Sequence, residues 1–315
     1  MQTAFLSDSL PVVNVASVPQ RSPFRYPGGK TWFVPYLRAW LSSLPRKPLI
    51  FVEPFAGGGI ASLTAVMEGL VHRAVMAELD SGVACVWKVI LGDNVTDLVS
   101  RIRKFEISRE TVIEELCRDP KDEVHLAFQT ILRNRVQRGG ILAPGASLVK
   151  NGENHRGVAS RWYPETLSKR ILAIAEVRDR IEFLHKDAFD VIPRFTGHTS
   201  ATFFVDPPYT AGGKSAGSRL YIHNHVNHAG LFEMLGTVSG SVMLTYDDAP
   251  AVRQFATRHA FFVREIPMKN THHNRLHELA LTNRRFDILT NAEDSPMLLA
   301  EKSARYGAGN KTKGR

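Results

Sequence analysis

Two short apolar runs, each ending at an acidic residue, mark the first part of the chain. Residues 49–52 are apolar and lead, through a glutamate and a proline, to the glycine run 57–59. Apolar residues then recur at helical spacing over 60–70, and a second apolar run over 74–77 ends at Glu78. A strand, a glycine turn, a helix and a second strand ending in an acid predict the first half of a doubly wound, nucleotide-binding sheet.

The hydrophobic pattern changes between about residues 93 and 180. Apolar residues over 124–132 and 167–174 are spaced as on one face of a helix, and the stretch 137–163 between them is rich in Gly and Asn. Strand-like apolar runs then return at 181–184, 202–205, 241–244, 261–263 and 276–282. This order predicts one α/β domain that is interrupted by an insertion.

We therefore predict an α/β fold, in which a doubly wound, mostly parallel, Rossmann-like sheet carries an inserted and mainly helical domain. The α/β domain is discontinuous, over residues 22–92 and 181–290, and the insertion covers 93–180. Residues 1–21 show no clear period and are expected to form an N-terminal arm. The polar and basic tail over 291–315 is expected to be disordered.

Composition and charge change this picture only slightly. Hydrophobic residues make up 43% and charged residues 23% of the 315 positions, which is typical of a globular protein and excludes a disordered chain. The net charge of +9 favours a polyanionic partner, because lysine and arginine neutralise phosphates. Many basic proteins bind no anion, so the charge alone leaves the partner open.

Cysteine usage and hydropathy bear on the compartment. Cys85 and Cys117 lie in helical patterns without a CxxC neighbour, so neither a disulfide framework nor a zinc site is expected. The N-terminus lacks the pattern of a signal peptide, and no apolar run is long enough to span a bilayer. We expect a cytoplasmic protein without membrane contact.

The glycine run after the first predicted strand suits a bound ligand. Glycine lets the backbone approach a ligand closely, and the N-terminus of the following helix favours the ligand's negative groups. Glu78, at the end of the next strand, can accept hydrogen bonds from both hydroxyls of a ribose. A dinucleotide site or a plain tight turn would show the same glycines, so this motif alone is ambiguous.

The segment Asp206-Pro207-Pro208-Tyr209 is more specific. It follows the apolar run 202–205, at the carboxyl end of a strand, where open α/β sheets place their sites. The exocyclic amine of adenine is a poor nucleophile because its lone pair is delocalised into the ring. The Asp206 carboxylate and the Pro207 carbonyl could accept its two hydrogens and localise that lone pair, while Tyr209 offers a face for an extruded base. A structural turn with a buried tyrosine is the alternative.

These motifs and their order resemble the Dam-type DNA adenine-N6 methyltransferases over about residues 22–290. In that family a Gly-Gly-Lys segment comes first, and the glycine-rich loop, a target-recognition insertion and Asp-Pro-Pro-Tyr follow. The segment 24–30, Phe-Arg-Tyr-Pro-Gly-Gly-Lys, takes the first place here. The family usually has Trp-Ala where this chain has Tyr26 and Pro27, and Tyr26 can still pack on a cofactor.

The resemblance implies an S-adenosylmethionine-dependent enzyme that flips an adenine out of duplex DNA and methylates it by direct displacement. It implies that Glu78 holds the cofactor's ribose and that Asp187, in Lys186-Asp187-Ala188-Phe189, holds its adenine amine. The implied catalytic residues are Asp206, Pro207, Pro208 and Tyr209. The implied cofactor-binding residues are Tyr26, Gly28, Gly29, Lys30, Glu53, Pro54, Phe55, Gly57, Gly59, Glu78, Asp187 and Asp206.

The insertion carries the charge expected of a DNA-binding module. Residues 131–170 hold eight basic side chains against two acidic ones, with Asn and Gln between them. The segment 134–139 matches the family's Asn-Arg-x-x-x-Gly feature, which implies a contact near the target base. The candidate DNA-binding residues are Arg133, Asn134, Arg135, Arg138, Lys150 and Arg156. A solvated charged face is the alternative, and Trp162 and Tyr163 are expected to anchor the insertion to the core.

No metal is expected. His273 and His277 have the spacing of a helical zinc pair, but the surrounding pattern is that of a strand, and a sulfonium is already an activated methyl donor. We expect a monomer that acts on double-stranded DNA, with a restriction endonuclease as a candidate functional partner. Two other functions stay open: methylation of RNA or of the cytosine amine, and DNA binding by an inactive methyltransferase fold.

Overall fold

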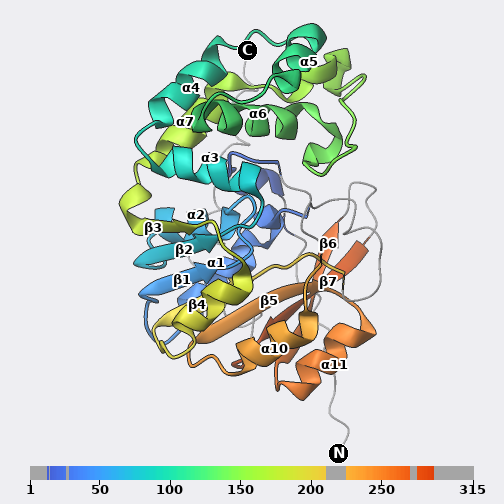
Figure 1. Cartoon of the computed structure of the whole chain (residues 1–315). Helices are drawn as coiled ribbons and strands as arrows, with labels where there is room; N and C mark the ends of the chain where they lie inside the picture. The colour runs from blue at the N-terminus through green and yellow to red at the C-terminus, as the bar shows by residue number, and fades with distance from the viewer. Residues whose placement is uncertain (1–12, 14, 26–27, 211–224, 270–274, 287–315) are drawn as a thin grey trace, which may run out of the picture.

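One sheet forms the centre of the molecule (Figure 1). The computed structural model describes residues 13, 15–25, 28–210, 225–269 and 275–286. Within these residues the sheet has seven strands in the order β3-β2-β1-β4-β5-β7-β6. The strands are β1 (Ile50–Glu53), β2 (Arg73–Ala77), β3 (Ile181–Leu184), β4 (Ala201–Val205), β5 (Ser241–Asp247), β6 (Phe262–Lys269) and β7 (Arg275–Thr282).

The sheet is mixed and mostly parallel. Strands β3, β2, β1, β4 and β5 are parallel to their neighbours, with Phe51 of β1 opposite Ala74 of β2 and Thr202 of β4. Strand β7 pairs antiparallel with both β5 and β6 at one edge. The predicted fold class, a doubly wound and mostly parallel α/β sheet, is confirmed.

Helices cover both faces of the sheet, because successive strand residues point to opposite sides and both sides are apolar. Phe51, Met76 and Phe204 belong to a core on one face, whereas Val52 and Phe203 belong to a core on the other. The helices are α1 (Val34–Ser43), α2 (Ile60–Met67), α3 (Ser81–Leu91), α4 (Val95–Lys104), α5 (Arg109–Cys117), α6 (Glu123–Val136), α7 (Pro164–Ala175), α8 (Ala188–Val191), α10 (His228–Gly236) and α11 (Pro250–Arg258).

Helices α3 to α7 form a separate layer above strands β1 to β3 (Figure 1). Helix α6 packs on α3, and α4 packs on α7. Phe105, Phe128 and Trp162 meet edge to face inside this layer, with ring centroids 5.2 to 6.3 Å apart. Trp162 is buried among rings of the layer itself, whereas Tyr163 is 47% exposed, and their predicted role as anchors of the insertion to the core stays a prediction. The exact division of the chain into domains stays a prediction.

The order of the strands fixes where a ligand can bind. From β1 the chain moves outwards to β2 and β3, then returns to β4 on the other side of β1. This reversal leaves a crevice beyond the carboxyl ends of β1 and β4, which is the general ligand site of open α/β sheets. The first glycine-rich turn and Asp206 both lie at these ends.

Candidate active site

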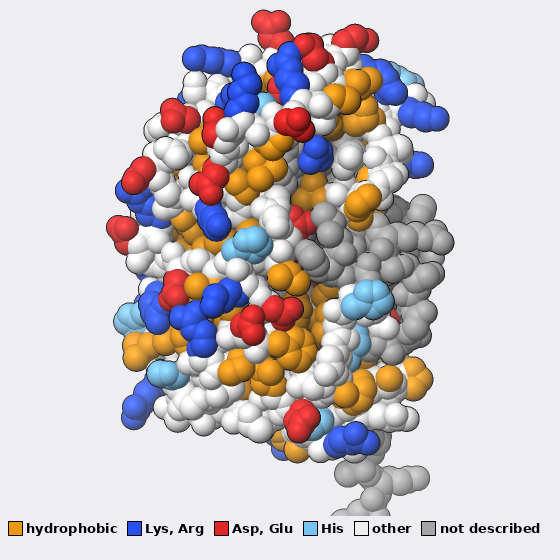
Figure 2. All heavy atoms as spheres, viewed as in Figure 1, with side chains coloured by type: hydrophobic (Ala, Val, Ile, Leu, Met, Phe, Trp, Pro, Cys, Tyr) orange, Lys and Arg blue, Asp and Glu red, His pale blue; other side chains and the backbone are white. Residues whose placement is uncertain are grey.

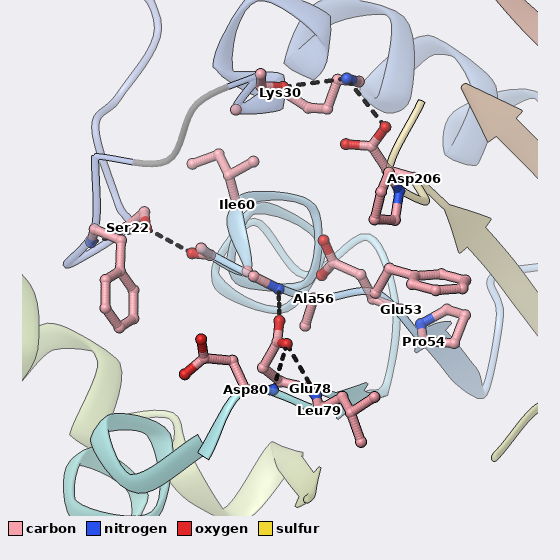
Figure 3. A pocket seen from close by; sticks show the side chains of 18 of the residues that line it. Ser22, Lys30, Glu53, Pro54, Ala56, Ile60, Glu78, Leu79, Asp80 and Asp206 are labelled. Atoms are coloured by element: carbon pink, nitrogen blue, oxygen red, sulfur yellow. Dashed lines mark hydrogen bonds and ion pairs between the residues drawn. The ribbon is translucent and has the colours of Figure 1, made fainter. Parts of the chain in front are cut away.

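A cavity of about 390 Å³ lies at the carboxyl ends of β1, β2 and β4. This volume is within the range of roughly 300 to 1,000 Å³ that is typical of small-molecule sites. Acidic side chains reach it from each of these strand ends, Glu53 from β1, Glu78 from β2 and Asp206 from β4, as Figure 3 shows. The predicted residues that line it are Gly28, Gly29, Lys30, Glu53, Pro54, Phe55, Gly57, Gly59, Glu78, Asp187, Asp206 and Pro208.

The glycine loop between β1 and α2 is held against the floor of the cavity. Gly57 and Gly59 have positive φ angles of 47° and 63°, a conformation that side chains other than glycine rarely adopt. A Cβ on Gly59 would lie 2.5 Å from Met76 Cε and 2.9 Å from the Trp87 ring. The Trp87 indole donates to the Gly57 carbonyl at 2.9 Å. Glycine is therefore required at position 59 by both backbone and packing.

Glu78 is half-buried, and backbone amides surround its carboxylate. Oε2 accepts from Gly57 N at 2.9 Å, and Oε1 accepts from Leu79 N at 2.8 Å and Asp80 N at 2.9 Å. Burial raises the pKa of Glu78, while these amides act in the opposite direction. The amides fix the orientation of the carboxylate, and its role towards a ribose stays a prediction.

Glu53 ends β1 and is almost fully buried. Its Oε2 accepts from Ser62 N at 2.8 Å, in the first turn of α2. Burial raises the pKa of Glu53 to about 8, and the hydrogen bonds from Ser62 oppose that rise. In its protonated form the side chain would offer the cavity a proton donor as well as an acceptor.

Three donors converge on one oxygen of Asp206. Oδ1 lies 3.0 Å from Lys30 Nζ and accepts from the Tyr209 hydroxyl at 2.9 Å and from the Thr245 hydroxyl at 2.7 Å. Glu278, on β7, lies beside two of these donors: its Oε2 is 3.3 Å from Lys30 Nζ and 3.1 Å from the Tyr209 hydroxyl, whose single hydrogen is shared between the two carboxylates. We call Lys30, Asp206, Tyr209, Thr245 and Glu278 the acid–lysine network.

The other carboxylate oxygen of Asp206 is turned towards the cavity. Oδ2 receives no hydrogen bond from the residues that the structure describes, and Figure 3 shows it pointing into the cavity, away from Lys30. Pro207 is buried behind it and Pro208 lines the wall. The arrangement leaves one carboxylate oxygen available to a ligand.

The charges of the network are set by burial and by each other. Burial lowers the pKa of Lys30, but the ion pairs with Asp206 and Glu278 outweigh it, so the net pKa is raised and the lysine stays charged. Burial raises the pKa of Glu278, against the opposite effect of Lys30. Burial also raises the pKa of Tyr209 well above its ordinary value, so its hydroxyl stays a donor.

The ring of Tyr209 is packed against other side chains of the protein. Its ring stacks on Tyr246 with centroids 5.7 Å apart and planes 22° apart, and Lys30 Nζ lies 4.9 Å from its centroid. The side chain is half-buried and does not line the cavity. The structure thus gives Tyr209 the role of a donor to Asp206, and the stacking of a base on it stays a prediction.

Asp187 lies on the β3 side of the cavity. Its Oδ1 accepts from Phe189 N at 2.8 Å and caps the short helix α8. Lys186 and Phe189 line the cavity beside it. This position is compatible with the predicted contact to a cofactor's base. Tyr26, the remaining predicted cofactor residue, lies outside the described residues.

Two predicted DNA contacts are corrected by the structure. Asn134 is fully buried: its Oδ1 accepts from Arg25 N at 2.8 Å and its Nδ2 donates to Arg25 O at 3.0 Å and Gly140 O at 2.8 Å. Arg135 is buried as well and donates to Pro23 O at 2.5 Å. Both side chains are engaged inside the protein, so they hold the segment 22–25 and do not face DNA.

The other four predicted DNA residues remain accessible. Arg138, Lys150 and Arg156 are exposed, and Arg133 is half-buried. Arg156 lies over the exposed Tyr163 ring, 5.8 Å from its centroid. On the face shown in Figure 2, cationic and anionic side chains alternate over the helical layer, without one large patch of a single sign. Their contact with DNA stays a prediction.

Among the residues of the site that the sequence analysis missed, three make polar contacts there. Arg170, on α7, lines the cavity and donates to Ser22 O at 3.5 Å. Thr245 and Glu278 join the acid–lysine network from β5 and β7. Thr245 and Glu278 are both buried, and a polar residue within a predicted strand of the core is the signal that could have indicated them.

The histidines that the structure describes lie apart from one another or contact other side chains. His225 lines the cavity, and His228 contacts the Tyr246 hydroxyl at 3.0 Å and Thr210 Oγ1 at 2.9 Å. His277 is exposed on β7, and His223, His272 and His273 lie outside the described residues. Among the described residues, no three His, Cys, Asp or Glu side chains are grouped so as to hold a metal ion.

Comparison with known proteins supports the resemblance. Residues 26–123 match the family described as D12 class N6 adenine-specific DNA methyltransferase. This match confirms the resemblance that the motif order predicted. No curated protein matches the chain.

In the part of the chain that the structure describes, no helix is long and apolar enough to cross a bilayer.

Two solved structures are similar to this chain at low sequence identity. One is the SAM-dependent methyltransferase from Agrobacterium tumefaciens, with 11% identity, a TM-score of 0.37, and coverage of 80% of this chain and 60% of that one. Another is the rRNA methyltransferase AviRa from Streptomyces viridochromogenes, with 14% identity, a TM-score of 0.40, and coverage of 92% and 96%. The present chain thus spans less than two thirds of the first of these proteins.

Proposed function

We propose that this chain is an S-adenosylmethionine-dependent DNA methyltransferase that methylates the exocyclic amine of adenine. The observation that carries the proposal is the geometry of Asp206, whose Oδ2 is turned into a cavity that the glycine loop also lines. The family match over residues 26–123 supports the same reaction and the same nucleobase.

The residues of the cavity fit S-adenosylmethionine. The glycine loop admits a ligand close to the backbone, and Glu78 lies at the end of the next strand, where it would accept from ribose hydroxyls. Asp187 lies further along the same edge, and would hold the adenine of the cofactor. The cofactor, when bound, supplies a methyl group that its sulfonium activates for transfer.

Asp206 and Pro207 would act on the substrate amine. The Oδ2 of Asp206, which faces the cavity, would accept one hydrogen of the amine, and the Pro207 carbonyl would accept the other. Accepting both hydrogens draws the nitrogen towards tetrahedral geometry, which concentrates its lone pair on the side opposite to them. Most of the rate enhancement would then come from positioning and from these hydrogen bonds.

The adenine must leave the duplex to reach Asp206, because its amine is paired inside the helix. We propose that the exposed Arg138, Lys150 and Arg156 bind DNA phosphates beside the target. Arginine and lysine at the surface contact phosphates without reading sequence, so these three side chains would set the position of the DNA.

The test is methyl transfer from labelled S-adenosylmethionine to duplex DNA by the full chain, followed by digestion to nucleosides. We expect the label in N6-methyl-2′-deoxyadenosine. Label in a methylated cytosine, or transfer to RNA and not to DNA, would contradict the proposed substrate. Cofactor binding without transfer to any nucleic acid would contradict the proposed activity. Sequencing-based detection of methylated adenines in DNA from cells that express the chain would then locate the target.

A further inference from the structure

We propose that Glu278 and Thr245 are positioning residues for the reaction, because they fix which oxygen of Asp206 faces the substrate amine. This inference rests on the proposed function and adds two residues, from β5 and β7, to its site. Neither residue belongs to the tetrapeptide after β4, and both are buried within the acid–lysine network.

The first argument is the count of donors on each oxygen of Asp206. A carboxylate oxygen has about two lone-pair directions, so the three donors on Oδ1 leave it no capacity for a substrate hydrogen. Thr245 contributes the shortest of these contacts, at 2.7 Å, against 2.9 Å for Tyr209 and 3.0 Å for Lys30. The carboxylate cannot rotate without losing all three, so Oδ2 stays in the cavity.

The second argument is the sharing of donors with Glu278. Its Oε2 lies 3.3 Å from Lys30 Nζ and 3.1 Å from the Tyr209 hydroxyl, so Glu278 contacts both groups and helps to fix their positions. Glu278→Gln weakens the partner that both donors share with Asp206, so Lys30 and Tyr209 would be held less firmly and the Asp206 carboxylate would be less strictly oriented.

The fold places these residues together by strand pairing. Thr245 lies opposite Ala280 in the β5–β7 register, and Glu278 lies opposite Asp247 on the same pair of strands. Strand β5 is the parallel neighbour of β4, which delivers Asp206. The antiparallel strand β7 thus brings an acid to the site from the far end of the sequence, and Glu278 remains 8% exposed.

The experiment compares Thr245→Val, Thr245→Ser and Glu278→Gln with the wild-type chain in methyl transfer to DNA. Removal of the Thr245 hydroxyl should lower kcat about tenfold, and Glu278→Gln should lower it about 10- to 100-fold, because small losses of alignment are costly for a positioned reaction. Thr245→Ser keeps the hydroxyl and should restore most of the rate. The Kd for S-adenosylmethionine should change less than kcat, since Glu78 and Asp187, the predicted partners of its ribose and its adenine, lie outside the network.

Glu265→Gln is the matched control. Glu265 lies on β6, beside β7, and its exposed carboxylate pairs with Arg253. The same change of charge on the neighbouring strand should leave kcat within about twofold, as is usual for exposed pairs. A loss equal to that of Glu278→Gln would indicate a general effect of charge on this edge of the sheet, and would overturn the inference.

Two results separate this inference from the proposed function. If Asp206→Ala is inactive while Thr245→Val and Glu278→Gln keep wild-type kcat, the positioning role is wrong and the methyltransferase proposal stands. Crystal structures of both variants test the inference without any activity, and Asp206 should have rotated or shifted in each. An unchanged Asp206 in both variants would overturn it, even if the wild-type chain transferred no methyl group.

Discussion

The cavity at the sheet edge and the helical layer above it were both predicted as functional regions, but on different grounds. Residues of the cavity were predicted from motifs at strand ends and from the Gly-Gly-Lys segment, and those that the structure describes lie around one cavity, except Pro207 and Tyr209, which do not line it. Residues of the helical layer were predicted from their polar and basic types and from the Asn-Arg-x-x-x-Gly segment, and two of six, Asn134 and Arg135, are buried. A strand end has a fixed location in an open α/β sheet, whereas a charged residue on a helix has no assigned face.

The largest expected effect is on the side of the cavity. Asp206→Ala removes the proposed acceptor and should lower kcat by about a thousandfold or more, the loss typical of a group that acts on the reacting atoms. The affinity for S-adenosylmethionine, measured by calorimetry, should stay within a fewfold. Asp248→Ala is the control, because Asp248 is exposed and pairs with Arg253. Full activity of Asp206→Ala would contradict the assignment of the cavity as the active site.

The second prediction concerns the buried acid Glu53. Its pKa of about 8 in the folded chain lies above the ordinary value of 4.5, so the folded state holds a proton that the unfolded state loses first. The stabilisation is complete below pH 4.5 and is lost as the pH rises to about 8. The free energy of unfolding should therefore fall by roughly 2 to 5 kcal/mol across this window on account of Glu53.

Glu53→Gln should remove that part of the pH dependence. The amide can still accept from Ser62 N, so the variant should retain the fold while its free energy of unfolding changes less between pH 5 and pH 8. Urea denaturation at several pH values measures this difference. Equal slopes for the variant and the wild type would show that Glu53 is ionised in the folded state.

The third prediction tests the helical layer where the residue is buried. Asn134→Ala leaves the Arg25 amide and two carbonyls without their partner, which should cost roughly 2 to 4 kcal/mol of the free energy of unfolding. Arg138→Ala, at an exposed position close by, should change it by less than about 0.5 kcal/mol. If both variants were equally stable, the contrast between the buried and the exposed residues of the layer would fail.

The smallest expected effect is at the exposed arginines and lysine. Alanine at Arg138, Lys150 or Arg156 should each weaken duplex binding about two- to fivefold at moderate salt and reduce the salt slope by about 1. Lys47→Ala, at an exposed position before the amino end of β1, should leave both unchanged. Fluorescence anisotropy over a salt series measures this, and an unaffected slope in all three variants would exclude them as phosphate contacts.

The fold was predictable because its signals are local. The apolar runs located every strand, and β3 is found over the predicted residues 181–184, but β6 extends six residues beyond the predicted run 261–263. The antiparallel direction of β7 was not predictable, because pairing direction depends on contacts between distant segments and not on the run itself. Thr245 and Glu278 were missed for the same reason: each is a polar residue within a strand, and its partner is distant in the sequence.

The fate of Arg135 shows the corresponding limit for charge. A surplus of basic residues indicates a polyanionic partner for the region as a whole. It does not tell which guanidinium forms hydrogen bonds inside the protein and which one is exposed. Burial and the neighbouring charges of Arg170, Arg25 and Arg161 lower the pKa of Arg135 to about 9. Its internal carbonyl partner lies over a hundred positions earlier, which no local pattern could reveal.

The segment 22–25 makes the two regions mechanically continuous. Asn134 and Arg135 of α6 and Arg170 of α7 grip its backbone from above, while Ser22 Oγ donates to Gly58 O in the loop below at 2.6 Å. If DNA binding tilted these two helices, the movement would be transmitted through this segment to the glycine loop. Through these four residues, binding of DNA and binding of a cofactor would each affect the other.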